Sequence, residues 1–291
     1  MWKKAGKRKL PAVEAFLRRR ECFCVGAVSR FLGGPDYIWT APSARQDHAG
    51  QDQLAALLLY CRQLLFPVFN LSPPEAAEFR MTGMPLPSFF SLVLLTMPLH
   101  AMQGLAEDMD LLEITLEKRK ILPAVKFDYE LRSFEADPEN PPPVPKGPPG
   151  LIIRKSEPED INGLFPLQAA YEKEEVLPPG AEFNPAVCLK GLEYLVAGNK
   201  TLTAELDGML VGKININAQS FNRFQIGGVY VLPEFRNLGI ARIMTVSLIR
   251  ELSSRKKDFT LFVKKANAPA RKVYDKIGFA KIGDYRINYY L

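Results

Sequence analysis

The sequence predicts two domains, and for the second of them a mixed α/β fold in which helices pack on the faces of a sheet. Prolines and glycines crowd residues 137–150, a composition typical of a stiff linker between two halves of ordinary domain size. After it, strand and helix patterns follow in the order β α α β β β α β α β. We therefore expect an N-terminal domain over 1–136, a linker over 137–150 and a C-terminal domain over 151–291.

The composition is that of a globular chain, with 47% hydrophobic and 24% charged residues. The richest apolar stretch, residues 89–99, is too short to span a membrane, which takes about 20 apolar residues. The basic start of the chain leads into Pro11 and Glu14, where a signal peptide would need an apolar core. We expect a cytoplasmic protein, neither secreted nor membrane-spanning, that is a monomer or a homodimer.

The chain has too few cysteines and histidines for a disulfide framework or a metal site. Its net charge of +6 is a mild excess, much of it within residues 1–20. A solvated basic tail explains this charge, and contact with nucleic acid or an anionic surface is the alternative. Beside the basic cluster at residues 3–9 the only aromatic is Trp2, which argues against nucleic acid.

In the C-terminal domain, Ser156 is the expected cap of the first helix, and Asp207-Gly208 predicts a tight type I′ hairpin. Ile240, Met244 and Leu248 recur every fourth residue, as on the buried face of an amphipathic helix. Strands are expected over 151–154, 201–206, 209–216, 225–231 and 259–263, helices over 156–176, 184–194, 240–252 and 269–277, and a final pair of strands within 280–290.

The turn between the expected strand at 225–231 and the helix at 240–252 carries the pattern Arg236-x-x-Gly239-x-Ala241. At the start of a helix, backbone N–H groups converge and the helix dipole adds positive potential. Gly239 and Ala241 let an anion approach the backbone closely. This geometry suits a pyrophosphate.

Two segments together, V-Y-V-L-P-E-F-R-N-L-G-I-A (residues 229–241) and N-A-P-A-R-K-V-Y-D-K-I-G-F (residues 267–279), resemble the cofactor motifs of the GNAT superfamily of acyl-CoA-dependent N-acetyltransferases. The resemblance covers the C-terminal half. Glu174-Glu175-Val176, residues 225–230 and residues 284–290 are similar to a bacterial subgroup with an additional N-terminal domain. The resemblance implies a mostly antiparallel sheet with helices on both faces, acetyl-CoA as cosubstrate and no metal.

The resemblance also implies a role for each matching position. Tyr274 matches a tyrosine that protonates the departing CoA thiolate, with packing beside Phe279 as the alternative. Asn267 matches a contact of the cofactor arm, with a plain helix cap as the alternative. The implied cofactor-binding residues are Val229, Tyr230 and Val231 at the acetyl and pantetheine groups, Arg236, Asn237, Leu238, Gly239, Ile240, Ala241 and Arg242 at the pyrophosphate, and Asn267 and Tyr274.

A primary amine, with a pKa of about 10.4, must lose a proton before it attacks the thioester. Glu174 and Glu175 lie near the end of the first helix, where this fold forms the acceptor wall, and are the candidate bases. Glu193 and Glu205 are alternatives, a solvated helix face is the simpler interpretation of the first pair, and a water chain would replace them all. The amide of Val229 or Val231 would stabilise the oxyanion.

The N-terminal half predicts a helix over 10–32 interrupted near Gly26, strands over 54–60, 64–70, 89–96 and 125–131, and a short helix over 99–109. This order repeats that of the C-terminal half and suggests a second, degenerate GNAT-like domain. Residues 97–104 have no equivalent of the Arg236 pattern, so we expect no cofactor there. The expected use of this domain is to cover the C-terminal sheet and shape the acceptor pocket.

The resemblance therefore predicts an N-acetyltransferase that transfers an acetyl group from acetyl-CoA to a primary amine by direct attack, with Tyr274 as general acid. The acceptor, a small molecule or a peptide, is not specified by the sequence. The alternative from another class is a non-catalytic regulatory module that binds acyl-CoA.

Overall fold

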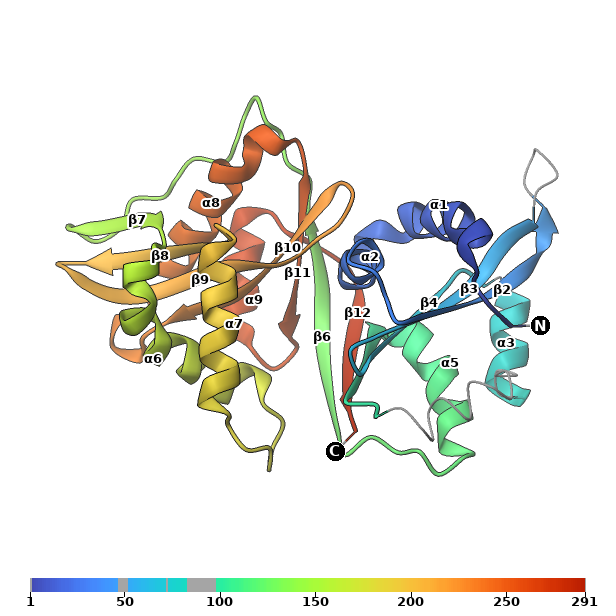
Figure 1. Cartoon of the computed structure of the whole chain (residues 1–291). Coiled ribbons are helices and arrows are strands. Elements are labelled where there is room, and N and C mark those ends of the chain that lie inside the picture. Colours follow the sequence, from blue (N-terminus) through green and yellow to red (C-terminus); the bar gives the residue numbers. More distant parts are fainter. Residues whose placement is uncertain (1, 47–51, 72, 83–97, 291) are drawn as a thin grey trace. The chain divides into compact units, whose positions relative to one another are not determined.

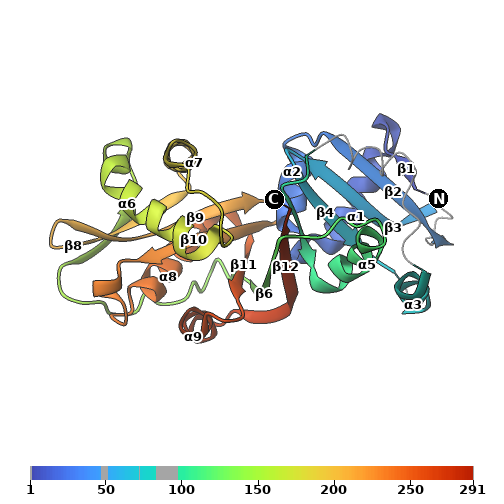
Figure 2. The ribbon, with the colours of Figure 1, turned by 90° about the horizontal axis from the view of Figure 1, so that it is seen from below.

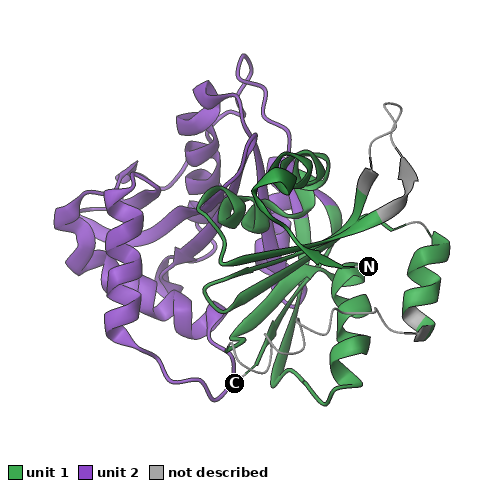
Figure 3. Cartoon of the chain, turned by 45° about the vertical axis from the view of Figure 1, so that its right-hand side comes forward, with its two compact units in different colours: residues 1–131, 282–291 green, residues 132–281 purple. Residues whose placement is uncertain are grey.

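The computed structural model describes residues 2–46, 52–71, 73–82 and 98–290. The chain divides into two compact units, residues 1–131 with 282–291 (unit 1) and residues 132–281 (unit 2) (Figure 3). The units differ from the expected domains at the end of the chain, because residues 282–291 belong to unit 1. The Pro-rich segment lies within unit 2, where Arg250 Nη1 donates to the carbonyls of Pro141 (3.3 Å) and Pro142 (3.2 Å).

Unit 1 is a sheet with helices on its two faces. Its elements are β1 (Lys3–Lys4), α1 (Leu10–Arg20), α2 (Val25–Leu32), β2 (Tyr37–Gln46), β3 (Asp52–Cys61), β4 (Leu64–Phe69), α3 (Pro73–Thr82), β5 (Ala101–Leu105), α5 (Ala106–Glu117), β6 (Val125–Phe134), whose last residues belong to unit 2, and β12 (Ala280–Tyr289). The strand order is β1-β2-β3-β4-β5-β12-β6. Helices α1 and α2 lie on one face, and α3 and α5 on the other (Figure 1).

Strand β3 explains why this sheet is buried on both faces. Leu57, Leu58 and Leu59 are consecutive, and each is 0% exposed. An uninterrupted apolar run of this kind is typical of a strand that helices cover on both sides. Arg62 and Gln63, with φ of 48° and 67°, form the tight turn to β4.

Unit 2 contains β7 (Leu151–Lys155), α6 (Ile161–Tyr171), α7 (Pro185–Ala197), β8 (Thr201–Leu206), β9 (Met209–Gln219), β10 (Arg223–Val231), α8 (Ile240–Leu252), β11 (Asp258–Lys264) and α9 (Ala268–Ile277). The strand order is β11-β10-β9-β8-β7. Helices α6 and α7 cover one face of this sheet, and α8 and α9 the other (Figure 2). No helix in the described part of the chain has the length and apolar character needed to cross a membrane.

The expected order of elements in the C-terminal half is confirmed. Asp207 and Gly208 have φ of 49° and 82°, as a type I′ turn requires. The predicted stripe on α8 is buried, with Ile240, Met244 and Leu248 no more than 3% exposed. These residues join the core that fills unit 2 between α8 and the sheet.

Two predictions for this half were wrong. Ser156 does not cap the first helix, because its hydroxyl bonds Thr203 Oγ1 at 2.6 Å, and Glu157 and Asp160 form the capping box instead. Residues 280–290 do not form a pair of strands. They contain one long strand, β12, which the partner β5 holds extended over Tyr285–Tyr289.

In the N-terminal half, more of the observed elements differ from the predicted ones. Residues 99–109 are not a helix, because Ala101–Leu105 pairs with β12 as strand β5 and the helix α5 begins only at Ala106. The break in the first helix falls at Glu21–Phe23 rather than at Gly26. Strand β2 was not predicted, since Pro42 and its neighbouring bulge interrupt the pattern. The predicted strand at 89–96 lies outside the described residues.

The returning strand β12 supplies unit 1 with a polar cluster that is buried around Glu113 and exposed at its edge. Arg286 donates to Asp128 (2.9 Å), to Glu113 (3.1 Å) and to Asp110. Asn288, which is 0% exposed, donates to Glu113 at 2.8 Å. Burial by itself would raise the pKa of Glu113, but these donors and Lys126 hold it below its usual value. The cluster therefore fastens the C-terminal strand to α5.

Replacing Arg286 with Met should lower the free energy of unfolding by about 1–3 kcal/mol, because the buried Glu113 would lose a charged donor. Urea titration measures this loss. The matched control is Arg255→Met, since Arg255 is exposed in unit 2 and its replacement should cost less than about 0.5 kcal/mol. Equal unfolding midpoints for Arg286→Met and the wild type would contradict the role of the cluster.

Candidate functional site

Two parallel strands of unit 2 stop pairing partway along their length. Strands β10 and β11 pair over Arg223–Gln225 and Asp258–Thr260. Within the described residues, no further residue of β10 pairs with β11, although β10 continues to Val231 and β11 to Lys264. Backbone N–H and C=O groups need partners. The two facing edges therefore offer hydrogen-bonding groups to an extended ligand.

A bulge bends β10 just beyond the point where its pairing with β11 ends. Its register with β9 shifts between Gly227 and Tyr230, and Gly228 has a φ of +58°. A Cβ at Gly228 would lie 1.8 Å from Asn215 Oδ1 and 2.7 Å from Lys213 Nζ. Position 228 therefore requires glycine for its backbone conformation and for space.

The predicted anion-binding turn follows β10 directly. A 3-10 turn at Pro233–Phe235 leads to Asn237 and Gly239, whose φ angles are +66° and +79°, and α8 begins at the next residue. A Cβ at Gly239 would meet no described atom within 4 Å. The first amides of a helix have no partner within the helix. The turn thus presents free N–H groups to open space.

The side chains of the predicted pyrophosphate residues are placed unequally. Leu238 is 47% exposed, whereas Ile240 is 1% exposed and belongs to the core. Arg242 Nη2 donates to the carbonyl of Lys276 at 3.4 Å. The backbone of the turn is therefore more accessible to a ligand than several of its side chains.

Arg236 ties this turn to the end of β10. Its Nε donates to the carbonyl of Val231 at 3.1 Å, and its Nη2 donates to Glu174 Oε2 at 2.9 Å. The guanidinium also lies over the ring of Tyr230, 5.4 Å from the centroid. The side chain that was predicted to hold a pyrophosphate is thus already bound to protein groups on one side.

The predicted glutamates lie on a π-helical turn, Glu172–Val176, that continues α6. Glu174 pairs with Arg236, and Glu175 accepts from Lys264 Nζ (3.3 Å) and from Asn267 Nδ2 (3.1 Å). The structure therefore brings both glutamates to residues at or after the ends of β10 and β11, where each is ion-paired.

The other two candidate bases are placed elsewhere. Glu205 lies on β8 and accepts from Arg154 at 3.0 Å. Glu193 lies on the exposed side of α7. In the described part of the chain, neither Glu193 nor Glu205 is bonded to the π-helical turn, Lys264 or Asn267.

Asn267 and Tyr274 are both on α9. Asn267 caps this helix by accepting from the Ala270 amide at 3.0 Å, while its amide nitrogen donates to Glu175. Tyr274 is 7% exposed and packs edge-on against Phe279, with centroids 5.8 Å apart. Burial, aided by the nearby Tyr171 and Glu175, raises the pKa of Tyr274 above its ordinary value. Its hydroxyl is therefore protonated at neutral pH.

Sequence reasoning missed Lys213, which lies on β9 behind the bulge and is 0% exposed. Its Nζ donates to Asn215 Oδ1 (2.9 Å) and to the carbonyl of Gly228 (3.0 Å). Lys213, Asn215 and Asn217 alternate along the strand and so share one face. Polar residues at alternate positions are typical of the solvated face of a strand, so the sequence pattern did not indicate that Lys213 is buried.

The groups around Lys213 come from three elements. The ring of Tyr171 at the end of α6 lies 5.2 Å from Nζ, and Glu172 on the π-helical turn accepts from Gln168 at 2.8 Å. Burial, followed by Glu172, raises the pKa of the Cys188 thiol on α7 to about 12. Burial lowers the pKa of Lys213 to about 7, although Glu172 and Cys188 oppose this shift.

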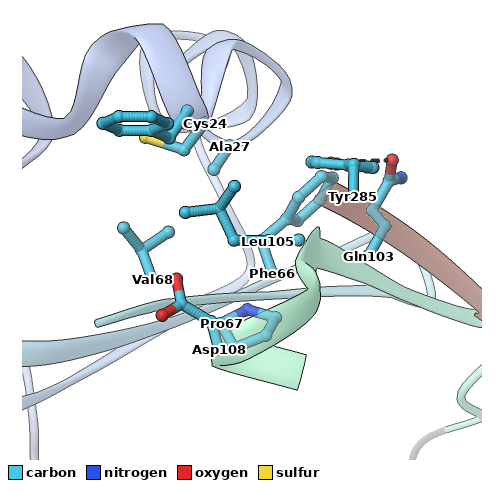
Figure 4. A pocket seen from close by; sticks show the side chains of 11 residues that line it. Cys24, Ala27, Phe66, Pro67, Val68, Gln103, Leu105, Asp108 and Tyr285 are labelled. Carbon is cyan, nitrogen blue, oxygen red and sulfur yellow. Dashed lines mark hydrogen bonds between the residues drawn. The ribbon is translucent and has the colours of Figure 1, made fainter. Parts of the chain in front are cut away.

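Unit 1 contains a small pocket at the corresponding strands, lined by Phe66, Gln103, Leu105, Asp108 and Tyr285 among others (Figure 4). Strands β4 and β5 are parallel and pair at Leu64–Leu65 and Ala101–Met102. Burial raises the pKa of Asp108 to about 7. The hydroxyl of Tyr285 donates to Gln103 at 3.3 Å and closes one side.

The helix that follows β4 differs from α8 at its start. Helix α3 begins with Pro73 and Pro74, which have no N–H, and Glu75 lies in its first turn. This start cannot present the row of amides that α8 presents. Among the described residues of both units, no group of three His, Cys, Asp or Glu side chains could hold a metal ion.

The chain is similar to one family model and to several solved structures. Residues 219–288 match the family model described as FR47-like protein. No curated protein matches the chain significantly. Over 99% of its length the chain is similar in structure to a Drosophila protein (98% of that chain, 13% identity, TM-score 0.66), to a GCN5-related N-acetyltransferase from Sphaerobacter thermophilus (94%, 17%, 0.61) and to a tandem GNAT protein from the clavulanic acid biosynthesis pathway (97%, 11%, 0.57).

The chain has the tandem GNAT fold, in which each half contributes a mixed and mostly antiparallel sheet. The predicted fold class and the resemblance of the C-terminal half to the GNAT superfamily are confirmed. The second GNAT-like fold in the N-terminal half is confirmed as well. The matched segment 219–288 contains the predicted anion-binding turn, α8, β11 and α9.

The buried Lys213 makes stability depend on pH. Its pKa is about 7 in the folded chain against an ordinary value of 10.5. Between these values the unfolded chain holds a proton that the folded chain lacks, so the free energy of unfolding rises with pH, by at most about 1.4 kcal/mol per unit. Urea titrations from about pH 6 to pH 10 should show the wild type gaining stability relative to Lys213→Met above pH 7. Parallel profiles would contradict a lowered pKa.

Proposed function

We propose that the protein is an N-acetyltransferase that transfers the acetyl group of acetyl-CoA to a primary amine of a small molecule or peptide. The observation that carries the proposal is the divergence of β10 from β11, together with the open N-terminal turn of α8 into which β10 leads. An extended thioester with a pyrophosphate at one end fits both features. Two of the similar structures, a GCN5-related N-acetyltransferase and a tandem GNAT protein, support the choice of acyl transfer.

The turn between β10 and α8 would hold the pyrophosphate through its backbone. Asn237, Leu238, Gly239, Ile240 and Ala241 supply the amides, with the positive end of the α8 dipole behind them. Arg236 and Arg242 add positive charge at the edge of this turn. Because Arg236 is already bound to Glu174 and to Val231, we propose that it mainly fixes the shape of the turn.

The strand edge of β10 would hold the rest of the substrate. Val229, Tyr230 and Val231 lie at and beyond the bulge, where β10 no longer pairs with β11. Their backbone groups would bond the pantetheine arm, and the amide of Val229 would bond the thioester carbonyl. A preorganised amide at this atom stabilises the oxyanion that forms during attack, by about 3 kcal/mol in comparable sites. Asn267 would contact the arm from the start of α9.

Acetyl-CoA supplies an activated acyl group, and the chain must supply proton transfer. The incoming amine loses a proton, and the C–N bond forms as the C–S bond breaks. We propose Tyr274 as the acid that protonates the departing thiolate, because its hydroxyl is buried and protonated at neutral pH. Its raised pKa means that the rate should not fall in the neutral range through loss of this proton.

Glu174 and Glu175 are the proposed route for the proton of the amine. Each already accepts from a cation, Arg236 and Lys264 respectively. We therefore propose that they act through water while holding the π-helical turn against Arg236 and Lys264.

Replacing Gly239 with Val should weaken CoA binding at least about tenfold, because the side chain would occupy the space before the amides and strain a backbone with φ of +79°. Isothermal titration calorimetry measures the dissociation constant. Gly208→Val is the matched control, since Gly208 has φ of +82°, equally open surroundings and a place in the distant β8–β9 hairpin. A folded Gly239→Val variant with an unchanged dissociation constant would refute the assignment of the turn.

Replacing Tyr274 with Phe should lower kcat by about 10- to 1000-fold with little change in CoA affinity, since the ring continues to pack against Phe279. Thiol release from acetyl-CoA across a panel of primary amines provides the assay. Tyr285→Phe, which alters a buried tyrosine of unit 1, is the control.

The outcomes of this experiment separate three interpretations. A full rate for Tyr274→Phe would refute the acid role and leave water as the donor. Equal losses of rate and of CoA binding would make Tyr274 a packing residue. A wild-type chain that binds acetyl-CoA and acetylates no amine in the panel would favour the non-catalytic acyl-CoA-binding module.

A further inference from the structure

We propose that Lys213 is a positioning residue for acyl transfer, which holds the carbonyl of Gly228 and thereby fixes the direction in which the amide of Val229 points. The contact that carries this inference is the 3.0 Å hydrogen bond from Lys213 Nζ to the Gly228 oxygen. The inference rests on the proposed function, because only an acyl group bound at β10 would make use of the aimed amide.

The link between the two atoms is the peptide bond itself. The carbonyl of Gly228 and the N–H of Val229 belong to one planar trans unit, in which they point in opposite directions. A donor that fixes the carbonyl on one side therefore fixes the N–H on the other. Lys213 Nζ is such a donor, so the Val229 amide points away from Lys213 Nζ.

This peptide plane needs such a restraint because it lies within a bulge. Register with β9 is lost between Gly227 and Tyr230, so regular ladder bonds do not fix the plane there. Glycine at φ of +58° also has wide conformational freedom. Without a bond to the Gly228 oxygen, the amide of Val229 would sample several directions.

Lys213 is itself held in place by a chain of side-chain bonds. Its Nζ donates to Asn215 Oδ1 at 2.9 Å, and Asn215 Nδ2 donates to Asn217 Oδ1 at 2.7 Å. These residues alternate along β9 and lie next to the bulge, since a Cβ at Gly227 would come within 1.9 Å of Asn217 Nδ2. The network therefore follows the bulge and touches both of its glycines.

A buried lysine at this position lowers the stability of the fold, so stability does not explain its presence. A fully buried amine is unfavourable unless it is hydrogen-bonded, and an apolar side chain of similar length would avoid the cost. With its pKa at about 7, much of the Lys213 population is neutral near pH 7, facing Tyr171, Glu172 and Cys188. A neutral amine has two N–H donors, which match the two acceptors that the structure provides.

The test replaces Lys213 with Met and follows the carbonyl of bound [1-13C]acetyl-CoA by infrared difference spectroscopy. In the wild type a bond from Val229 should shift the stretch to lower frequency than in free acetyl-CoA. In Lys213→Met we expect that shift to disappear and kcat to fall by about 10- to 100-fold, with the KM for acetyl-CoA changing less than about threefold.

The matched control is Lys257→Met. Lys257 Nζ also donates to a backbone carbonyl, that of Ser220, at 2.9 Å, but it does so at the other end of β10. Its loss should leave the carbonyl shift and kcat as in the wild type. If Lys213→Met does not fold, Lys213→Gln keeps a donor of shorter reach and should show a reduced carbonyl shift.

The outcomes distinguish this inference from the proposed function. A Lys213 variant that binds acetyl-CoA with the wild-type carbonyl shift would overturn the positioning role and leave the proposed function intact. The same shift loss in Lys257→Met would overturn it as well, because the effect would then not be specific to the bulge. A wild-type chain that fails to bind acetyl-CoA would overturn both proposals.

Discussion

The site in unit 2 depends on one constraint, the point at which β10 and β11 stop pairing. Because the two strands are parallel, their connection must cross over, and it does so through α8. A crossover helix begins at the carboxyl end of the strand before it, so the N-terminus of α8 follows the part of β10 that has left β11. Helix α9 begins in the same way after β11. Phe224 and Phe259, 5.8 Å apart, pack below the divergence and fix its base.

Unit 1 also contains a pair of parallel strands, but these strands stay close together beyond their paired residues. Its parallel strands β4 and β5 also pair only briefly in the described register, but a Cβ at Gly104 would already lie 3.0 Å from the carbonyl of Pro67. The backbones therefore remain close where β10 and β11 diverge. Helix α3 starts with two prolines and an acidic residue. The two halves thus share a topology, while local residues give different starts to the helices α3 and α8.

The π-helical turn after α6 shows how local geometry serves the site. The wider turn directs the consecutive residues Glu174 and Glu175 to different elements, the first to Arg236 before α8 and the second to Lys264 and Asn267 between β11 and α9. π-Helical turns are often found at functional sites. Here a single turn connects the carboxyl ends of both diverging strands, and the bulge opposite it is held by Lys213.

The sequence by itself determined the elements whose signals are local. Asp207-Gly208 specified its hairpin and the apolar stripe of α8 its buried face, and the helix cap that was the alternative role of Asn267 is present. The turn at Gly239 could also be predicted from the sequence, because a left-handed glycine before a helix is a short-range feature. The fold class followed from the order of these elements.

Only the tertiary structure decided the features that depend on partners distant in the chain. Ala101–Leu105 is a strand because β12 and β4 pair with it, and residues 282–291 join unit 1 for the same reason. Glu174 and Glu175 carry no sequence signal that they would be ion-paired to Arg236 and Lys264. Lys213 was hidden in the same way: a lysine in a strand is ordinarily solvated, and only packing against α6, α7 and the bulge removes its water and gives its amine two fixed acceptors. Local propensity acts over a few residues, whereas burial and charge pairing are set by contacts that the chain makes only when it is folded.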